Sequence, residues 1–422
     1  MSKRTPILAA TALLALASFA AANGLNLNGL GTRAQAMGGA FVGVADDFSA
    51  VFWNPAGAAA FRQTTFGFNA FDVMPRATFQ WDPGLAFPEI MRVDAKSKFS
   101  HYLGGLAGYY KPLGPKVVVG LGIYTPSGQG LAWNGGDLVT RMGDPAYDWS
   151  IRTGMFSFSP LVAVKLSEAL SVGAAVNLNY GMFERMMPAY ADVLEGQTQY
   201  EENLNGWGIG ATVGVLVKPV DKLAIGLTVR TPSTVTLKGT ASMYALSMLE
   251  IPDSSELTRK ITWPLWIAGG VSFRPVPRLL LSADVHWTQW SELDRFDSDY
   301  ADPFWVTLMQ SAGLDSEDLD WEDTFQFRFG AELQLNASMA LRAGYATDQA
   351  PGPVGSWNVL FPTHAFDVFT VGVGKTIGGL QLDFGLEYLA GKDRIWESLL
   401  DESSSTYGLS VVVPSVSVSY KF

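Results

Sequence analysis

The feature of this chain that most constrains its fold is an alternation, at every second residue, of apolar side chains with polar or small ones. Between Leu170 and Tyr180 the even positions carry Leu, Val, Ala, Val, Leu and Tyr, whereas the odd positions carry Ser, Gly, Ala, Asn and Asn. A helix would mix both sets on each of its faces, whereas a strand separates them. The same alternation recurs at 325–335 and 380–388, so the sequence predicts an all-β protein.

Fourteen segments follow this strand pattern, and the connections between them alternate between short and long. Short periplasmic turns that alternate with long extracellular loops are typical of an outer-membrane barrel, and an even number of strands closes an antiparallel ring. We therefore predict a 14-stranded antiparallel transmembrane β-barrel. Its strands are expected at 62–73, 98–111, 116–125, 150–165, 170–181, 204–217, 222–232, 258–274, 278–290, 322–336, 338–347, 364–377, 379–390 and 406–422. The long connections are expected at 74–97, 126–149, 182–203, 233–257, 291–321, 348–363 and 391–405.

The composition agrees with a membrane barrel and not with membrane-spanning helices. Apolar residues make up 48% of the chain, yet beyond the N-terminus no stretch of eighteen or more is continuously apolar. A spanning helix needs about 20 such residues in a row. Charged residues make up 16%, below the ~25% that is usual in soluble domains. Apolar residues that are abundant but spread out in alternation indicate strands with one face in lipid.

The first 22 residues have the pattern of a secretory signal peptide. Lys3 and Arg4 precede an apolar stretch from Ile7 to Phe19, which ends at an Ala-x-Ala cleavage site, so we expect the mature chain to begin at Asn23. The chain has no cysteine, which excludes disulfides and thiolate metal sites. Its net charge of −11 argues against a nucleic-acid partner, since little would neutralise phosphates. Together these features indicate the outer membrane of a Gram-negative cell.

The C-terminus carries a second signal for the same location. The chain ends Val416-Ser-Val-Ser-Tyr-Lys-Phe422, with an apolar residue at every second position and a terminal aromatic residue. This ending resembles the signal that the outer-membrane barrel-assembly machinery reads, which predicts that machinery as a partner during biogenesis. The alternative is the edge strand of a soluble sheet.

The stretch from Gly29 to Gly57 differs from everything after it. It is rich in Gly, Ala, Phe and Val, with neither a helical stripe nor sustained alternation. Such a segment cannot form a domain alone and suits being packed inside a larger enclosure, which residues 62–422 would supply. With fourteen strands behind it, this segment resembles the N-terminal motif of the FadL/TodX family of outer-membrane transporters for hydrophobic compounds. The residues that carry the resemblance are Gly31, Arg33, Ala34, Gly38, Gly39, Ala40, Asp46, Asp47, Asn54, Pro55 and Ala56.

The resemblance implies a function and a route. In that family an N-terminal hatch plugs the lumen, and substrate leaves sideways through a gap made by a kinked third strand. Here it implies a hatch at 23–61 and an opening near Tyr124, Pro126 and Gly128, where proline removes a ladder donor and glycine weakens pairing. The alternative is that Pro126 simply begins a loop. The implied cargo is a long-chain fatty acid first, with aromatic or alkane hydrocarbons behind, carried by a monomer among outer-membrane lipid and lipopolysaccharide.

Apolar residues in the expected extracellular loops are candidates for capturing that cargo. They fall at helix-like spacing in three loops, where water-facing segments should not be so apolar unless they pack or bind something. The alternative is that the loops pack on one another as a lid, and both roles can hold. The candidate residues are Phe183, Met186, Met187, Met243, Leu246, Phe304, Trp305 and Leu308.

Charged residues at inward-facing strand positions allow a structural and a binding interpretation. The mixture of signs suggests salt bridges that brace the wall and hold the hatch, at Arg230, Asp284, His286, Arg328, Glu332, Arg342, Asp383 and Glu387. Alternatively, Arg328 or Arg342 receives a fatty-acid carboxylate, which a guanidinium fork fits well. Asp46 and Asp47 are expected to accept hydrogen bonds within the hatch rather than bind a cation, and no metal or cofactor is expected.

An enzyme and a diffusion porin are the rival classes. The chain has three histidines, His101, His286 and His364, and no Gly-x-Ser-x-Gly nucleophile elbow, so we expect no enzymatic activity. A general diffusion porin fits the strands but not the plug-like N-terminal segment. Conductance separates the two, because a porin passes steady ionic current and a hatched transporter passes almost none.

Overall fold

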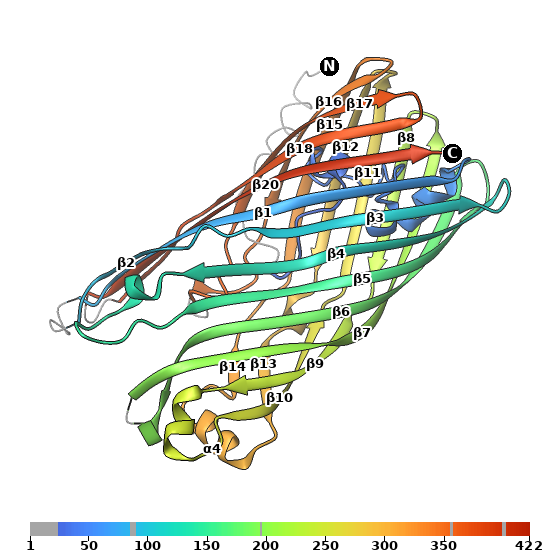
Figure 1. The fold of residues 1–422 in the computed structure, drawn as a ribbon. Coiled ribbons are helices and arrows are strands. Elements are labelled where there is room, and N and C mark those ends of the chain that lie inside the picture. Colours follow the sequence, from blue (N-terminus) through green and yellow to red (C-terminus); the bar gives the residue numbers. More distant parts are fainter. Residues whose placement is uncertain (1–23, 85–89, 195, 355–357, 399–401) are drawn as a thin grey trace, which may run out of the picture.

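A computed structural model describes residues 24–84, 90–194, 196–354, 358–398 and 402–422, so the expected signal peptide, 1–22, lies outside the described residues. Within these ranges fourteen antiparallel strands form a closed ring (Figure 1), which confirms the predicted barrel. Closure is made by β1 (Thr65–Asp82), which pairs with β3 (Tyr102–Pro112) on one side and β20 (Ser404–Lys421) on the other. The remaining members are β4 (Val117–Trp133), β5 (Trp149–Lys165), β6 (Leu170–Ala191), β7 (Gly196–Val220), β8 (Leu223–Arg230), β11 (Trp266–Val276), β12 (Leu279–Thr288), β15 (Thr324–Asn336), β16 (Met339–Asp348), β17 (Phe366–Ile377) and β18 (Leu380–Gly391).

The two faces of the wall follow the alternation read from the sequence. On β15, Phe325, Phe327 and Phe329 are exposed on the outer face, while Gln326 and Arg328 between them are buried in the interior. This polarity is inverted relative to a soluble protein, because lipid is the solvent for the outer face. None of the helices in the described part of the chain is long and apolar enough to cross a membrane.

Several strands continue far beyond the ends that the sequence predicted. The expected loop 182–203 is mostly strand, because β6 and β7 remain paired up to Ala191 and Gly196. The helix-like spacing assigned to Phe183, Met186 and Met187 was therefore wrong, since all three lie on β6. A barrel strand needs only ~9–11 residues to span a membrane. Beyond the membrane, β6 and β7 still satisfy their backbone hydrogen bonds by pairing with each other, so both strands can continue.

The expected loop 233–257 is also built mainly of strands. It contains β9 (Ser233–Ser242), the 3-10 helix η4 (Tyr244–Leu249) and the start of β10 (Ser254–Trp263). The expected strand 258–274 was wrong, because it is divided at Pro264 into the end of β10 and β11. Strands β9 and β10 pair with each other, and β9 also pairs with the upper part of β7. Pro232 and Pro264 mark where β8 gives way to β9 and β10 to β11. Proline lacks the N–H that a continuous ladder would use, so each strand breaks there.

The remaining short elements gather at the same end of the barrel, opposite the tight turns (Figure 1). The helix α4 (Pro303–Ser311) begins after Asp302, whose carboxylate accepts from the N–H groups of Phe304 and Trp305. The helix-like spacing of the apolar residues Phe304, Trp305 and Leu308 had indicated a helix in this segment. The other elements are β2 (Val93–Lys96), η2 (Gly135–Leu138), η3 (Asp192–Leu194), η5 (Trp290–Glu292), β13 (Arg295–Tyr300), α4 (Pro303–Ser311), β14 (Ser316–Asp318) and β19 (Arg394–Glu397).

Residues 24–61, which we call the hatch segment, lie inside the barrel toward the end with the tight turns (Figure 1). The segment contains α2 (Thr32–Gln35), α3 (Ala50–Trp53) and η1 (Pro55–Ala60), and most of its residues are fully buried. Small residues allow its backbone to touch the wall directly. A Cβ on Gly344 of β16 would lie 2.1 Å from the backbone nitrogen of Gly38, which itself has a φ of +65°. Glycine is the residue that tolerates both the close approach and the left-handed backbone.

Candidate functional site

The Asn-Pro-Ala motif joins the hatch segment to the wall. Asn54 caps η1, because its Oδ1 accepts from the N–H of Ala56 at 3.1 Å while Pro55 occupies the first helical position. Its Nδ2 donates to the carbonyl oxygens of Val42, at 3.1 Å, and Val215, at 3.0 Å. The side chain is fully buried, and its three hydrogen bonds hold the hatch segment together and against β7.

The two adjacent acids of the hatch segment both lie close to one arginine. Arg33 contacts Asp46 directly, lies 3.8 Å from Asp47, and reaches the wall at Glu332, 2.7 Å away. Asp47 also accepts from the N–H of Ser49 at 2.9 Å and from its hydroxyl at 2.6 Å. Burial raises the pKa of Asp47, against the opposing effects of Arg33 and Ser49. These contacts account for both acids by hydrogen bonds and ion pairs, and no metal-binding cluster of His, Asp and Glu occurs in the described residues.

The inward arginines that were candidates for binding a carboxylate already have partners. Arg342 is buried between Glu332 and Asp383, with both nitrogen–oxygen distances at 2.7 Å. Arg328 donates to the backbone oxygens of Asn28 and Gly38 and to the side chain of Gln326. Arg328 therefore braces the wall against the hatch segment, whereas Arg342 braces wall strands and meets the hatch segment only through Glu332, which also binds Arg33.

The wall has a window between β3 and β4. Regular pairing of these strands ends at Leu106 and Tyr124, and β4 shifts register against β5 between Tyr124 and Ser127. Among the described residues, β4 next bonds the chain between β2 and β3 at Ala132, whose carbonyl accepts from the N–H of Lys98 at 2.7 Å. Strand β4 therefore runs on through Pro126 to Trp133, and Pro126 does not begin a loop.

The start of the hatch segment lies along the free edge of β4 in this window. The N–H of Leu27 donates to the carbonyl of Pro126 at 3.1 Å, and the N–H of Gly128 donates to the carbonyl of Leu25 at 3.2 Å. The hydroxyl of Ser127 also donates to Leu25, at 2.7 Å. The sequence had singled out Tyr124, Pro126 and Gly128. Tyr124 lies where pairing between β3 and β4 ends, and Pro126 and Gly128 lie on β4 along the window.

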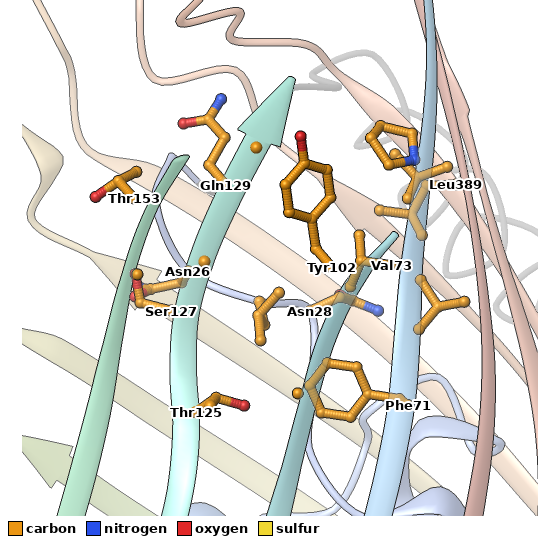
Figure 2. Close-up of a pocket in the computed structure, with 18 of the residues that line it drawn as sticks. Asn26, Asn28, Phe71, Val73, Tyr102, Thr125, Ser127, Gln129, Thr153 and Leu389 are labelled. Atoms are coloured by element: carbon orange, nitrogen blue, oxygen red, sulfur yellow. The ribbon is translucent and has the colours of Figure 1, made fainter. Parts of the chain in front are cut away.

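A cavity of about 200 Å³ lies behind the window (Figure 2). Its inner side includes Asn26 and Asn28 of the hatch segment, and Phe71 and Val73 of β1 lie on the wall side. The lining also includes Leu103, which is 81% exposed on the outer face of the barrel. The lining of this cavity therefore combines residues of the hatch segment with a side chain of the outer face of the barrel.

Glycines keep the outer side of this window free of side chains. Gly128 pairs with Gly154 across β4 and β5, two residues from the outward-facing Phe156. A Cβ on Gly128 would have no neighbour closer than 3.9 Å, so this position opens onto empty space. Gly130 is different, because the ring of Tyr102 occupies the place where its Cβ would be.

A second cavity, of about 260 Å³, lies among the extracellular elements. Phe183 and Met187 of β6 line it together with Phe296 and Phe361. Beside it is a buried ion cluster in which Glu202 accepts from Arg259 at 2.7 Å and lies 2.9 Å from Arg185. The other predicted capture residues are not in this cavity. Met243, Leu246, Trp305 and Leu308 are buried in the extracellular core, Phe304 packs against it half-buried, and Met186 is on the outer face.

Several residues of these sites were not predicted from the sequence. Gln35, Gln129 and His364 line the window cavity, and the ion cluster of Arg185, Glu202 and Arg259 supports the extracellular elements. Gln129 lies in a segment expected to be loop, and Gln35 has no charge or motif to mark it. Glu202 and Arg259 both fit the alternation of their strands. Glu202 lies past the predicted end of its strand, whereas Arg259 lies inside the predicted strand 258–274, where the alternation alone could have placed it inward.

Comparison with known proteins gives one consistent result. A sequence model described as "outer membrane protein transport protein (OMPP1/FadL/TodX)" matches residues 12–422. Outer membrane protein P1 of Haemophilus influenzae is 23% identical, over 93% of this chain and 91% of its own. The fold is similar to that of a Pseudomonas aeruginosa FadL homologue, with a TM-score of 0.77 at 16% identity over 95% and 100% of the two chains. The P. putida toluene transporter TodX has a TM-score of 0.75 at 16% identity, over 94% of this chain and 99% of its own.

Proposed function

This chain belongs to the OMPP1/FadL/TodX family of outer-membrane transport proteins for hydrophobic compounds, and from that premise we propose that its cargo leaves sideways through the window between β3 and β4. The cargo enters among the extracellular elements, where apolar side chains line the second cavity. It then occupies the window cavity and passes into the bilayer. The protein releases the cargo unchanged and has no enzymatic activity.

The observation that supports this route most strongly is the mixed lining of the window cavity. Buried residues of the hatch segment and the lipid-facing Leu103 border the same space. A long apolar molecule gains ~0.8 kcal/mol for each CH₂ group that leaves water. If the cargo passes into lipid, its CH₂ groups stay out of water. If it passes into the aqueous periplasm, they are exposed to water again and that free energy is lost.

Both cargo classes implied by the family, fatty acids and hydrocarbons, have the apolar body that this route requires. The toluene transporter TodX is similar in fold, as is the FadL homologue, so fold similarity does not choose between the classes. A general diffusion porin is the weaker candidate, because buried residues of the hatch segment fill the lumen near the turns.

Closing the window tests the route. Gly128→Leu places an apolar side chain in the open space at its outer edge, and we expect uptake of a labelled alkane by cells that express the protein to fall several-fold. Gly269→Leu is the matched control, because a Cβ at Gly269 on β11 meets nothing within 4 Å and likewise opens onto empty space. Both variants should migrate on gels as folded, heat-modifiable barrels. Equal uptake by the two folded variants would exclude the window as the exit.

A further inference from the structure

Three of the tight turns repeat one sequence pattern. Each begins with a basic residue and a proline, continues with an apolar residue and closes with a second basic residue. The pattern is Lys-Pro-Leu-Gly-Pro-Lys at 111–116, Lys-Pro-Val-Asp-Lys at 218–222 and Arg-Pro-Val-Pro-Arg at 274–278. We call these segments the basic turns, and we propose that they bind the phosphate groups of anionic phospholipid in the adjoining leaflet of the membrane. This goes beyond the proposed function, because it concerns membrane lipid and not the cargo.

The apolar residue of each basic turn is exposed. Leu113 is 60%, Val220 is 59% and Val276 is 52% exposed. The lipid-facing side of the wall leads directly to these turns, because the exposed Phe273 comes one residue before the third turn and the exposed Tyr109 two residues before the first. Exposed apolar side chains on such a barrel lie in lipid. The basic turns therefore lie at the boundary of the hydrocarbon and not out in the water beyond it.

The six basic residues that flank these apolar residues have no acidic partner in the protein. Five of the six are exposed, and Arg274 is half-buried. Among the described residues of the six tight turns, the one ion pair joins Lys165 to Glu168 in a different turn. The cations of the basic turns are therefore available to an anion from outside the protein.

Strand pairing brings two of the basic turns together. Leu223 at the start of β8 pairs with Phe273 of β11, and the N–H of Arg274 donates to the carbonyl of Lys222 at 2.8 Å. Four basic residues thus lie in two adjoining turns, where Asp221 is the one acidic residue. Like charges on neighbouring strands repel each other and destabilise the pairing. A phosphate bound between them would relieve this repulsion.

The charges of the barrel are separated between its two ends. The extracellular segment 291–323 has eleven acidic residues and one basic residue, whereas the basic turns have six basic residues and one acidic residue. This contrast arises in a chain with 40 acidic and 29 basic residues. The tight turns of an outer-membrane barrel face the periplasm, so the positive end meets the inner, phospholipid leaflet. Lys and Arg near a membrane surface are attracted to anionic lipid head groups.

The combination of charges and apolar residues favours a lipid over a soluble anion. A free phosphate or an acidic peptide would use the cations alone, and the exposed apolar residue between them would add nothing to its binding. A phospholipid carries its phosphate next to its acyl chains. Each basic turn presents the matching arrangement, with an apolar side chain for the hydrocarbon and a cation on either side of it for the head group.

Lipids with identical acyl chains isolate the head group. Folded protein in detergent is incubated at low salt with an equimolar mixture of dimyristoyl phosphatidylglycerol, phosphatidylethanolamine and phosphatidylcholine. The protein is then separated from free lipid, and the retained lipid is measured by mass spectrometry. We expect phosphatidylglycerol to be retained roughly tenfold more than either zwitterionic lipid. In about 1 M salt the preference should largely disappear, because the Debye length falls to ~3 Å.

Two pairs of substitutions locate the effect. Lys218→Gln with Lys222→Gln removes two cations of one basic turn and should reduce the preference for phosphatidylglycerol several-fold. Lys238→Gln with Lys260→Gln is the matched control, because these two lysines are exposed on the extracellular strands β9 and β10 and the change in net charge is the same. All variants should migrate on gels as folded, heat-modifiable barrels. If one does not fold, the salt dependence of the unaltered protein still decides.

Three results would overturn the inference. The first is equal retention of the three lipids by the unaltered protein at low salt, or a preference that high salt leaves unchanged. The second is an equal effect of the two pairs of substitutions, which would assign the preference to net charge. The third is displacement of phosphatidylglycerol by glycerol 1-phosphate or by poly-glutamate at equal concentration, which would assign the basic turns to a free phosphate or to an acidic protein. The proposed function is tested by uptake, which none of these measurements uses, so the two can fail separately.

Discussion

The Nδ2 atom of Asn54 donates a hydrogen bond to the backbone oxygen of Val215, 3.0 Å away, and so ties the hatch segment to strand β7. The adjacent position on β7 is glycine, and a Cβ on Gly214 would lie 2.1 Å from the Oδ1 of Asn54. The wall is therefore shaped to receive this side chain. Since the same amide also bonds Val42, a single residue connects the two halves of the hatch segment with the barrel.

Replacing Asn54 should loosen the hatch without unfolding the barrel. Asn54→Leu leaves the carbonyl oxygens of Val42 and Val215 without their side-chain donor, at a cost of ~1–3 kcal/mol for each buried group left unsatisfied. We expect larger ionic current in planar bilayers and lower uptake of hydrophobic cargo. Asn205→Leu, at an exposed position of the same strand, is the control. Unchanged current and uptake in Asn54→Leu would remove the motif from the mechanism.

Arg33 provides a second test of how the hatch is held. Arg33→Met leaves the half-buried Asp46 and Asp47 without their cation, while Glu332 keeps its contact with Arg342. Removing one partner of a buried ion pair typically costs ~3–5 kcal/mol, so we expect faster hydrogen exchange throughout the hatch segment. Adding Asp46→Asn to Arg33→Met should partly restore protection, because it removes one of the stranded charges. No gain in protection from the second change would argue that the three charges act independently.

Glu202 should stabilise the extracellular elements in a similar way. Its fully buried carboxylate forms ion pairs with both Arg185 and Arg259. Arg185 also pairs with Glu317 on β14. Glu202→Gln leaves two buried guanidinium groups short of negative charge. We expect β9, β10 and β13 to become sensitive to protease while the membrane-spanning part stays folded. Glu201→Gln, at the exposed neighbouring position, should behave as the unaltered protein, and equal sensitivity of the two variants would contradict this role.

The sequence alone predicted the barrel well because lipid imposes a strong and regular pattern. Each spanning strand must alternate, as at Phe325 to Phe329, and each tight turn must break the pattern. The strand ends were predicted less well. Outside the membrane, lipid no longer imposes alternation. The pairing of β6 with β7 up to Ala191 depends there on contacts between chain segments that local sequence does not reveal.

The three residues that the sequence singled out for an opening lie along the irregular part of β4, but the lining of the cavity beside them was not predicted. Pro126 and Gly128 mark the strand irregularity directly, because proline lacks a donor and glycine lacks a side chain. The lining residues Gln35, Gln129 and His364 are held in place by bonds to the carbonyl oxygens of Gly29, Pro362 and Tyr407. Those partners are far from one another along the chain, so no spacing in the sequence could have assigned them.

The stability of the folded protein should fall in mild acid because of His364. This residue lies just before β17, outside the strands. Burial, with a smaller effect from Arg394, lowers its pKa to about 4 against the opposing effect of the bond to Tyr407. In the unfolded chain the pKa is ~6.5, so between these values the unfolded state binds a proton that the folded state does not. The contribution of the neutral ring is therefore complete above pH ~6.5 and declines as the pH falls toward 4, by up to ~3 kcal/mol. His364→Gln keeps a donor for the carbonyl of Tyr407 but cannot titrate. The temperature at which the gel mobility shifts should fall more steeply with acidification in the unaltered protein than in this variant, and parallel curves from pH 7.5 to 4.5 would show that His364 is not responsible.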